Sequence, residues 1–559
     1  MKNWAYCLAL VFFGLLAFFN AVRLPFVHDD VIFILNNPHI AALGSWREAF
    51  QAPIVSLDVN PYYRPILELI YRLEFHFFGP HSWGFHLFNI FVHILNGLLL
   101  FRLLKKLDFA LPLAWLIACI FLVHPVQTEA VCCISGISNL WMAFGVLLGL
   151  NAYMDKRYLA SVVFFVIAFF SKEQGILFVP LVVVIDCYRG QKNFQRWLFW
   201  GLTAVALLWL RQQVTGASLL KDIMVAPHEL YLRLAAVPRD LGMYLRLIFF
   251  PYDLHYYRST DILQPNGTAW IIALASVGGI LYVLKRLSLR PISSVIPSSH
   301  TVIPAKAGIH SKIILGFGWF FAALLPVLNI APLINEYSFI LTPEHFLYLP
   351  VVGVLIIVVC AADFLLTTLV VSKPSTVIPA KAGILKRFLS GSVITACLLV
   401  TWHQNTYWSS EIVLFERTLR YEKDFGRGHL LLAKAYYFNG HPEMAEGHFK
   451  KAYSIMSSYA KKATNQSAEK FYLGFVKEIL FDWAHNDSAR GNWQEALDKY
   501  KQAAIIDGKD ASLYNNMAFV YLHMGNKKDA YLCLKQALRI DPSSTQSKRN
   551  LQLMSDGSI

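Results

Sequence analysis

Long apolar runs alternate with short polar segments from residue 4 to residue 402. A helix needs about 20 apolar residues to cross a bilayer. The segment 237–250 is apolar in places but carries Arg239, Asp240 and Arg246, so we expect an interfacial or re-entrant helix there. The remaining runs predict about eleven membrane helices, at 4–22, 84–101, 111–123, 139–153, 157–170, 174–187, 197–211, 268–284, 313–331, 345–366 and 389–402.

After residue 405 the chain becomes polar and its pattern stays helical. Gly491-Asn492 recurs 34 residues later as Gly525-Asn526. This interval is the period of the tetratricopeptide repeat, in which paired helices cross closely at small residues. An earlier unit begins near Gly440, so we expect about three repeats over 405–559. Such repeats are binding surfaces, and the expected ligand is a partner or acceptor polypeptide.

These patterns predict an all-α chain, with a polytopic membrane domain over 1–404 and an α-solenoid over 405–559. The content of 56% hydrophobic and 15% charged residues excludes an ordinary soluble protein. The net charge of +14 lies largely in short segments between apolar runs, as the positive-inside rule requires, and so indicates topology rather than nucleic-acid binding. An odd number of spans places the N-terminus in the cytoplasm and the repeats outside.

The first apolar run is expected to be a retained anchor, because 18–23 is a poor cleavage site. The eight cysteines show no CxxC spacing, which favours core packing over a disulfide framework. The first outer loop is predicted at 23–83. The nonapeptide Thr-Val-Ile-Pro-Ala-Lys-Ala-Gly-Ile occurs at 301–309 and again at 376–384. We interpret both copies as insertions in cytoplasmic loops, near 294–312 and 373–388, rather than as a structural repeat.

Polar residues of unusual kinds gather in the segments predicted to lie outside. Two adjacent acids follow the first span, although a charge within the bilayer costs roughly 2.5–3.5 kcal/mol and like charges repel. Clustering on one membrane face is stronger evidence for a site than any single residue. The clusters are Asp29-Asp30, His124 to Glu129, Ser171-Lys172-Glu173 and 336–344.

Two of the cationic candidates have structural alternatives. Arg64 precedes a proline, which favours an extended backbone, and it can either reach a phosphate or form a salt bridge with Glu68 or Asp58. Lys172-Glu173 can be an interfacial snorkelling pair, or Lys172 can bind a phosphate.

The histidines also allow two interpretations. His86, Asn89 and His93 lie on one face of a helix, and three polar groups in a stripe favour a polar cavity over single packed histidines. His124 and Glu129 lie five residues apart, which permits metal ligation without specifying it. We prefer for them a role in positioning the acidic pair.

The motifs taken together resemble a known family over nearly the whole chain. They resemble the bacterial relatives of the transmembrane and tetratricopeptide-repeat-containing O-mannosyltransferases, within the GT-C glycosyltransferase superfamily. One departure is His345, where such proteins usually carry arginine. The matching pieces are His28-Asp29-Asp30, Asn36-Asn37-Pro38, Tyr63-Arg64-Pro65, His86 to His93, His124 to Val131, Ser171 to Gly175, Pro326 to Asn329 and Glu344 to Pro350.

The resemblance implies an enzyme that moves a sugar, by analogy mannose, from a polyprenyl-phosphate donor to an acceptor hydroxyl, with protein as the expected acceptor. It implies a bacterial inner membrane protein whose site lies on the outer face. The reaction needs a base and cations or a metal for the leaving phosphate. We expect Asp29 as the base and Asp30 as its orienting neighbour, because adjacent side chains on an extended segment diverge. The phosphate candidates are Arg64, Lys172 and Arg211, and the supporting residues are His28, His86, His93, His124, Glu129, Glu173, Glu344 and Tyr348.

No cofactor is specified by these residues, and a divalent metal stays an open alternative. A second hypothesis is a non-catalytic membrane scaffold whose repeats recruit envelope assembly factors. A third is a channel or transporter, since polar residues inside membranes also mark permeation paths. The gathering of the polar residues on one face, rather than at mid-membrane, favours the transferase.

Overall fold

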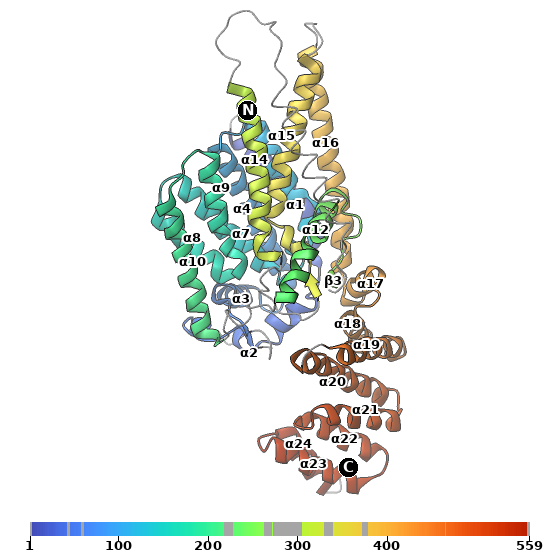
Figure 1. Ribbon diagram of the computed structural model, residues 1–559. Helices are drawn as coiled ribbons and strands as arrows, with labels where there is room; N and C mark the ends of the chain where they lie inside the picture. Colours follow the sequence, from blue (N-terminus) through green and yellow to red (C-terminus); the bar gives the residue numbers. More distant parts are fainter. Residues whose placement is uncertain are drawn as a thin grey trace, which may run out of the picture. The chain divides into compact units, whose positions relative to one another are not determined.

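The computed structural model describes residues 3–41, 45–56, 61–216, 227–261, 271, 304–328, 339–371, 378–463 and 466–555. The chain divides into two compact units, Met1–Ser410 and Glu411–Ile559 (Figure 1). The sequence had placed this division after residue 404.

The first unit is a bundle of helices joined by short 3-10 turns. Its α-helices are α1 (Asn3–Phe18), α2 (Pro38–Ala41), α3 (Pro65–Phe78), α4 (Ser82–Lys106), α5 (Leu111–Val123), α6 (Thr128–Cys132), α7 (Ile137–Met154), α8 (Tyr158–Ser171), α9 (Phe178–Tyr188), α10 (Phe194–Thr215), α12 (Pro227–Phe249), α14 (Pro304–Leu324), α15 (Pro350–Val371) and α16 (Ile378–Asn405). The turns that matter below are η1 (Phe19–Arg23), η4 (Pro125–Gln127), η5 (Glu173–Leu177), η7 (Glu344–Leu347) and η8 (Thr406–Trp408), together with the π-turn η2 (Val31–Leu35).

Six helices in the described part of the chain are long and apolar enough to cross a membrane, or seven if α5 and the bent continuation Pro125–Cys132 form one span. The prediction of about eleven is higher because α8 and α9 have only 14 and 11 residues, and α10 is not among the six. The predicted span 268–284 falls almost wholly outside the described residues. Helix α12 is also not among the six, as expected for 237–250.

Close approach of helices in this unit depends on glycine. A Cβ on Gly353 of α15 would lie 2.5 Å from the carbonyl oxygen of Gly316 on α14, closer than real atoms approach. A Cβ on Gly145 of α7 would lie 2.8 Å from the backbone nitrogen of Ala168 on α8. Small residues let membrane helices gain van der Waals contact in the absence of a hydrophobic driving force.

The duplicated nonapeptide is helical where it is described. Residues 304–309 begin α14 and residues 378–384 begin α16, so the prediction that both copies form loops is wrong for these parts. The remaining residues of both copies lie outside the described residues. Proline at the first helical position of α14 is compatible with a helix start, because it has no N–H to leave unpaired.

Within the described residues, four very short strands accompany the helices. β1 (Val55–Ser56) pairs with β2 (Pro61–Tyr62), and β3 (Ser259–Asp261) pairs with β4 (Phe339–Leu341), both antiparallel. The second ladder places Thr260 opposite Ile340, and so joins the segment after α12 to the segment before η7. This ladder brings two parts of the candidate site together.

The second unit confirms the predicted helical repeats. Gly440, Gly491 and Gly525, which begin the related units in the sequence, all have positive φ (80°, 79° and 76°) between paired helices. Glycine adopts this left-handed conformation without a Cβ penalty. Its helices are α17 (Glu411–Tyr421), α18 (Gly426–Phe438), α19 (Pro442–Lys462), α20 (Gln466–Ala489), α21 (Trp493–Ile506), α22 (Ala511–His523), α23 (Lys527–Ile540) and α24 (Thr545–Ser555).

Candidate functional site

The two adjacent acids after the first helix have different surroundings. Asp30 is fully buried and accepts hydrogen bonds from the backbone N–H groups of Ser135 (2.7 Å), Val27 (3.2 Å) and Ile134 (3.4 Å). Burial raises the pKa of Asp30 to about 6, although the N–H groups of Ser135 and Val27 oppose the rise. Asp30 therefore fastens the start of η2 to the connection between α6 and α7.

Asp29 keeps 35% of its side chain exposed. One carboxylate oxygen lies 3.3 Å from His28 Nε2, and the other accepts a hydrogen bond of 3.3 Å from the Tyr256 hydroxyl. His28 has a positive φ of 48°, which is uncommon for a residue with a side chain and often accompanies a functional site. The two acids thus diverge, and Asp29 is the one that solvent or a substrate can reach.

The three cations predicted to bind phosphate lie on separate segments. Arg64, which precedes α3, donates to Glu173 from Nε (3.2 Å) and from a terminal nitrogen (2.9 Å). Arg211 of α10 lies 3.8 Å from the same carboxylate. Of the two predicted alternative partners of Arg64, Glu68 pairs with Arg72 instead, and Asp58 lies outside the described residues.

Lys172 is 4% exposed, and its ammonium donates a 2.6 Å hydrogen bond to Asn139 Oδ1. The ammonium also lies 5.5 Å from the centre of the Phe346 ring. In the described part of the chain no carboxylate lies within ion-pair distance of it. Burial, reinforced by the charge of Arg64, lowers the pKa of Lys172 to about 7. A buried ammonium held by a neutral amide is electrostatically incomplete.

The connection between α6 and α7 joins the acids to the cations. Ser135 binds Asp30, and Asn139, four residues later, binds Lys172. The Tyr71 hydroxyl of α3 also donates to the Ser135 carbonyl (3.4 Å). One short segment therefore holds both halves of the predicted site.

Glu129, which is buried, and His345, which is 22% exposed, form a further pair. The carboxylate accepts a hydrogen bond from the His345 backbone N–H (2.8 Å) and lies 2.7 Å from Nδ1 of the same residue. Burial lowers the pKa of His345, although Glu129 opposes the shift. The residue that departs from the family pattern thus contacts a predicted supporting acid.

The contacts of His124 do not indicate that it binds a metal ion together with Glu129. Its Nδ1 accepts a hydrogen bond from the Val126 N–H (3.2 Å) at the start of η4, and its Nε2 lies 3.0 Å from the Ile248 carbonyl. Both ring nitrogens are therefore engaged within the protein. Among the described residues no three His, Cys, Asp or Glu side chains gather closely enough to hold a metal ion.

The side chains of the polar stripe on α4 contact backbone carbonyls of other segments and one tyrosine hydroxyl, and the predicted polar cavity stays a prediction. His86 Nε2 contacts the Leu24 carbonyl (3.0 Å), and Asn89 donates to the carbonyls of Val131 and Cys133. His93 Nε2 contacts the Leu122 carbonyl (3.0 Å), while Nδ1 contacts the hydroxyl of Tyr348 (2.7 Å). These side chains occupy carbonyls at segment ends, where helical partners are lacking.

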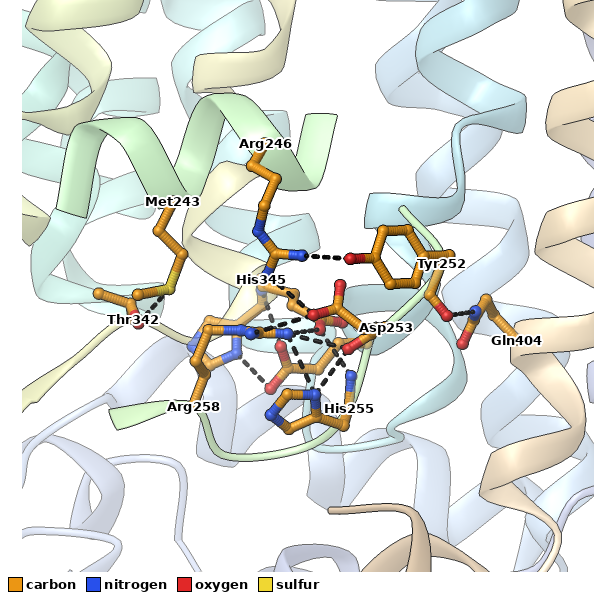
Figure 2. A network of polar contacts seen from close by, with 11 residues as sticks. Met243, Arg246, Tyr252, Asp253, His255, Arg258, Thr342, His345 and Gln404 are labelled. Atoms are coloured by element: carbon orange, nitrogen blue, oxygen red, sulfur yellow. Dashed lines mark hydrogen bonds and ion pairs between the residues drawn. The ribbon is translucent and has the colours of Figure 1, made fainter. Parts of the chain in front are cut away.

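A further polar network follows α12 and was not predicted (Figure 2). Arg258 donates to the Asp253 carbonyl (2.9 Å) and lies 3.7 Å from the Glu344 carboxylate, which accepts from the His255 N–H (2.7 Å). Arg246 donates to Asp253 at 2.8 Å. Burial raises the pKa of Glu344 well above its usual range. The dense run of Asp, His, Tyr and Arg over 252–258 was the signal that could have revealed it.

The network also fixes Tyr256, which donates to Asp29. The Tyr256 ring packs edge-on against His28 (5.6 Å between centres) and Trp408 (6.0 Å). The segment after α12 therefore contacts Asp29, the exposed acid, through Tyr256.

Comparison with known proteins agrees with both halves. The tetratricopeptide repeat family model matches residues 488–551. Over 467 residues the chain is 24% identical to "Protein O-mannosyl-transferase F38B6.6" of Caenorhabditis elegans, covering 81% of this chain and 63% of that protein. The chain is similar in sequence to a protein O-mannosyl-transferase over most of its length. The resemblance indicated by the motifs is confirmed.

Shorter matches point the same way. "Protein O-mannosyl-transferase TMTC1" of Mus musculus is 33% identical over 145 residues, 25% of this chain and 15% of that protein. "Protein O-mannosyl-transferase TMTC4" of Homo sapiens is 30% identical over 194 residues, 29% of this chain and 26% of that protein. The chain thus spans less than two thirds of the length of each of these three relatives.

Proposed function

We propose that the protein is a membrane glycosyltransferase of the GT-C type that transfers a sugar from a polyprenyl-phosphate donor to a hydroxyl group of a protein. The three relatives described above are all named protein O-mannosyl-transferases, so mannose is the first sugar to test. We place the reaction at the outer face of a bacterial inner membrane, on the basis of the basic residues between the predicted spans.

The observation that carries the proposal is the junction between α6 and α7. Ser135 of this segment binds Asp30, whose neighbour Asp29 is 35% exposed. Asn139 of the same segment binds the ammonium of Lys172, which has no carboxylate within ion-pair distance among the described residues. A transferase of this class needs such a pair, because one group must take a proton and another must bind a departing phosphate.

In the proposed reaction Asp29 accepts the proton of the acceptor hydroxyl. The acceptor oxygen forms a bond to the anomeric carbon of the sugar, and the bond from that carbon to the phosphate oxygen breaks. The electron pair leaves with the lipid phosphate, which gains negative charge that Lys172, Arg64 and Arg211 stabilise. His28 and Tyr256 hold the Asp29 carboxylate in place.

The repeats are proposed to bind the acceptor polypeptide. They supply an extended surface, as stacked helical repeats generally do. In the sequence, the repeat unit begins at Glu411, three residues after Trp408, whose ring contacts Tyr256.

The test is transfer of labelled sugar from polyprenyl-phosphate donors to proteins, in vesicles that carry the full chain. We expect Asp29→Asn to abolish transfer and Asp155→Asn to leave it unchanged. Asp155 is a suitable control, because it is 32% exposed and pairs with Lys106 (2.8 Å). Equal labelling with wild type and Asp29→Asn, or no labelling from any donor, would favour the scaffold hypothesis.

A further inference from the structure

The carboxylate of Glu173 is the shared anion of two arginines. Arg64 holds it with two nitrogens, and Arg211 approaches its other oxygen at 3.8 Å. The three side chains are 11–15% exposed, so solvent screens them only in part. Such a two-pronged grip on a planar anion is how arginine also recognises phosphate.

The positive charge in this cluster exceeds the negative charge. One carboxylate serves two guanidinium groups, and the direct contacts of the neighbouring Lys172 ammonium among the described residues are the amide of Asn139 and the Phe346 ring, while the carboxylates of Glu173 and Glu129 act on it only from beyond ion-pair distance. Buried charge without compensation is costly, so the cluster favours a ligand that brings more negative charge than a single carboxylate. A phosphate group does so, and offers more acceptor oxygens.

A second arginine nearby in the sequence shows the opposite balance. Arg72 of α3 is 4% exposed and pairs with Glu68 at 2.6 Å, and it lies 3.7 Å from a second acid, Glu48. Arg72 therefore has more negative partners than it needs. Arg64, which precedes α3, shares its one carboxylate with Arg211, whereas Arg72, inside the helix, has two acids near it.

We propose that Glu173 occupies, in the empty protein, the position of the donor's lipid phosphate, and that the phosphate displaces it from Arg64 and Arg211. The inference rests on the proposed function for the identity of the lipid, and goes beyond it by assigning Glu173 as an internal competitor. Glu173 keeps the two arginines ordered and partly neutralised until the donor arrives. After transfer, its return helps to release the lipid phosphate product.

The test measures binding to the purified full chain in detergent by titration calorimetry, without any transfer reaction. The probes are farnesyl phosphate, inorganic phosphate and farnesol. We expect Glu173→Gln to bind farnesyl phosphate roughly tenfold more tightly than wild type, because the competing carboxylate is gone and charge-assisted contacts are strong. The matched control Glu68→Gln should leave binding unchanged.

The probes separate the two sources of phosphate. An equal gain for inorganic phosphate supports a position that binds the phosphate alone, and a gain for farnesyl phosphate only supports one continuous with the lipid tail. Affinity of Glu173→Gln equal to or below that of wild type overturns the inference, as does a gain for farnesol.

A second variant covers failure of Glu173→Gln to fold. Arg211→Gln leaves the two-pronged contact between Arg64 and Glu173 intact, and we expect roughly tenfold weaker binding of farnesyl phosphate from loss of one charged contact. Unchanged binding overturns the inference. Because no sugar transfer is measured, absence of transferase activity would remove the proposed function while tighter binding by Glu173→Gln still stood.

Discussion

Polar contacts in the two units span very different distances along the chain. In the first unit, Asp30 binds a residue 105 positions away, and Arg64 binds one 109 away. In the repeats, Lys477 pairs with a residue 30 positions away and Lys499 with one 12 away. The first unit is therefore tied together by long-range buried contacts, whereas the repeats depend on neighbours, as stacked repeats generally do. The effect of a substitution on stability should therefore extend through the first unit but stay local in the second.

The largest effect is expected for Asp30→Ala. It leaves the N–H groups of Ser135, Val27 and Ile134 without their buried acceptor, at about 1–3 kcal/mol for each orphaned donor. We expect a loss of roughly 4 kcal/mol or more, measured as a lower melting temperature of the membrane unit in detergent. Asp29→Ala is the matched control, since its half-exposed carboxylate should affect transfer far more than stability. Equal stability of the two variants would contradict the anchoring role of Asp30.

A core deletion in the repeats should cost less stability than Asp30→Ala, and its effect should remain confined to the repeats. Leu534 of α23 is fully buried with Ala518 and Ala530. Leu534→Ala should destabilise the last repeats by about 3 kcal/mol, within the range for Leu→Ala in cores. Limited proteolysis should show earlier cleavage after α22, with the melting temperature of the first unit unchanged. Leu532→Ala, on the same helix but 54% exposed, should be nearly neutral. Loss of the first unit's stability would contradict the local behaviour assumed for the repeats.

The third prediction concerns pH. Burial lowers the pKa of Lys172 to about 7, and a bound phosphate should raise it. Binding of a phosphodiester donor is then fully favoured below pH 7 and weakens as pH rises above it, approaching tenfold for each pH unit. The charged and titratable groups that act on Lys172 are Arg64, Glu173, Glu129, Cys133 and His345. Burial lowers the pKa of His345, so His345 does not gain charge in this range.

The check is the donor KM between pH 6 and 9, in wild type and Lys172→Arg. Arginine stays charged throughout, so the slope should disappear in that variant. A slope retained in Lys172→Arg would assign the titration to another group.

The same contrast in contact range decides what could be predicted from the sequence. The repeats were predictable because a 34-residue period and three glycines are local signals. The two acids were expected to diverge on an extended segment, but Asp29 and Asp30 both have helical backbone geometry in the structure, so they diverge although that premise was wrong. The partner of Arg64 was not predictable, because Glu173 enters from a turn 109 residues away and nearer acids compete for it in the sequence.

The contacts of the polar stripe on α4 were not predictable from the sequence for a related reason. A helical pattern shows that His86, Asn89 and His93 share a face, but not what that face meets. In the structure it meets the carbonyl ends of other segments, whose positions depend on tertiary packing. The network over 252–258 was missed because its partner Glu344 is 89 residues from His255 and joins it through the β3–β4 ladder.

The smallest effect is expected for the exposed ion pairs of the repeats. Lys477 pairs with Asp507 (2.8 Å) and Asp510 (3.1 Å), whose side chains are 46% and 31% exposed. Exposed pairs contribute about 0.2–1 kcal/mol, so Lys477→Ala should lower the free energy of unfolding of the repeats by less than 1 kcal/mol. The measurement is denaturant unfolding monitored by proteolysis, at low salt and at roughly 1 M salt, where screening acts within about 3 Å. Because screening weakens the pair in wild type, the difference between wild type and variant should shrink at high salt. A difference that persists would mean that Lys477 acts through packing of its aliphatic stem, and would place a non-electrostatic contact between α20 and the start of α22.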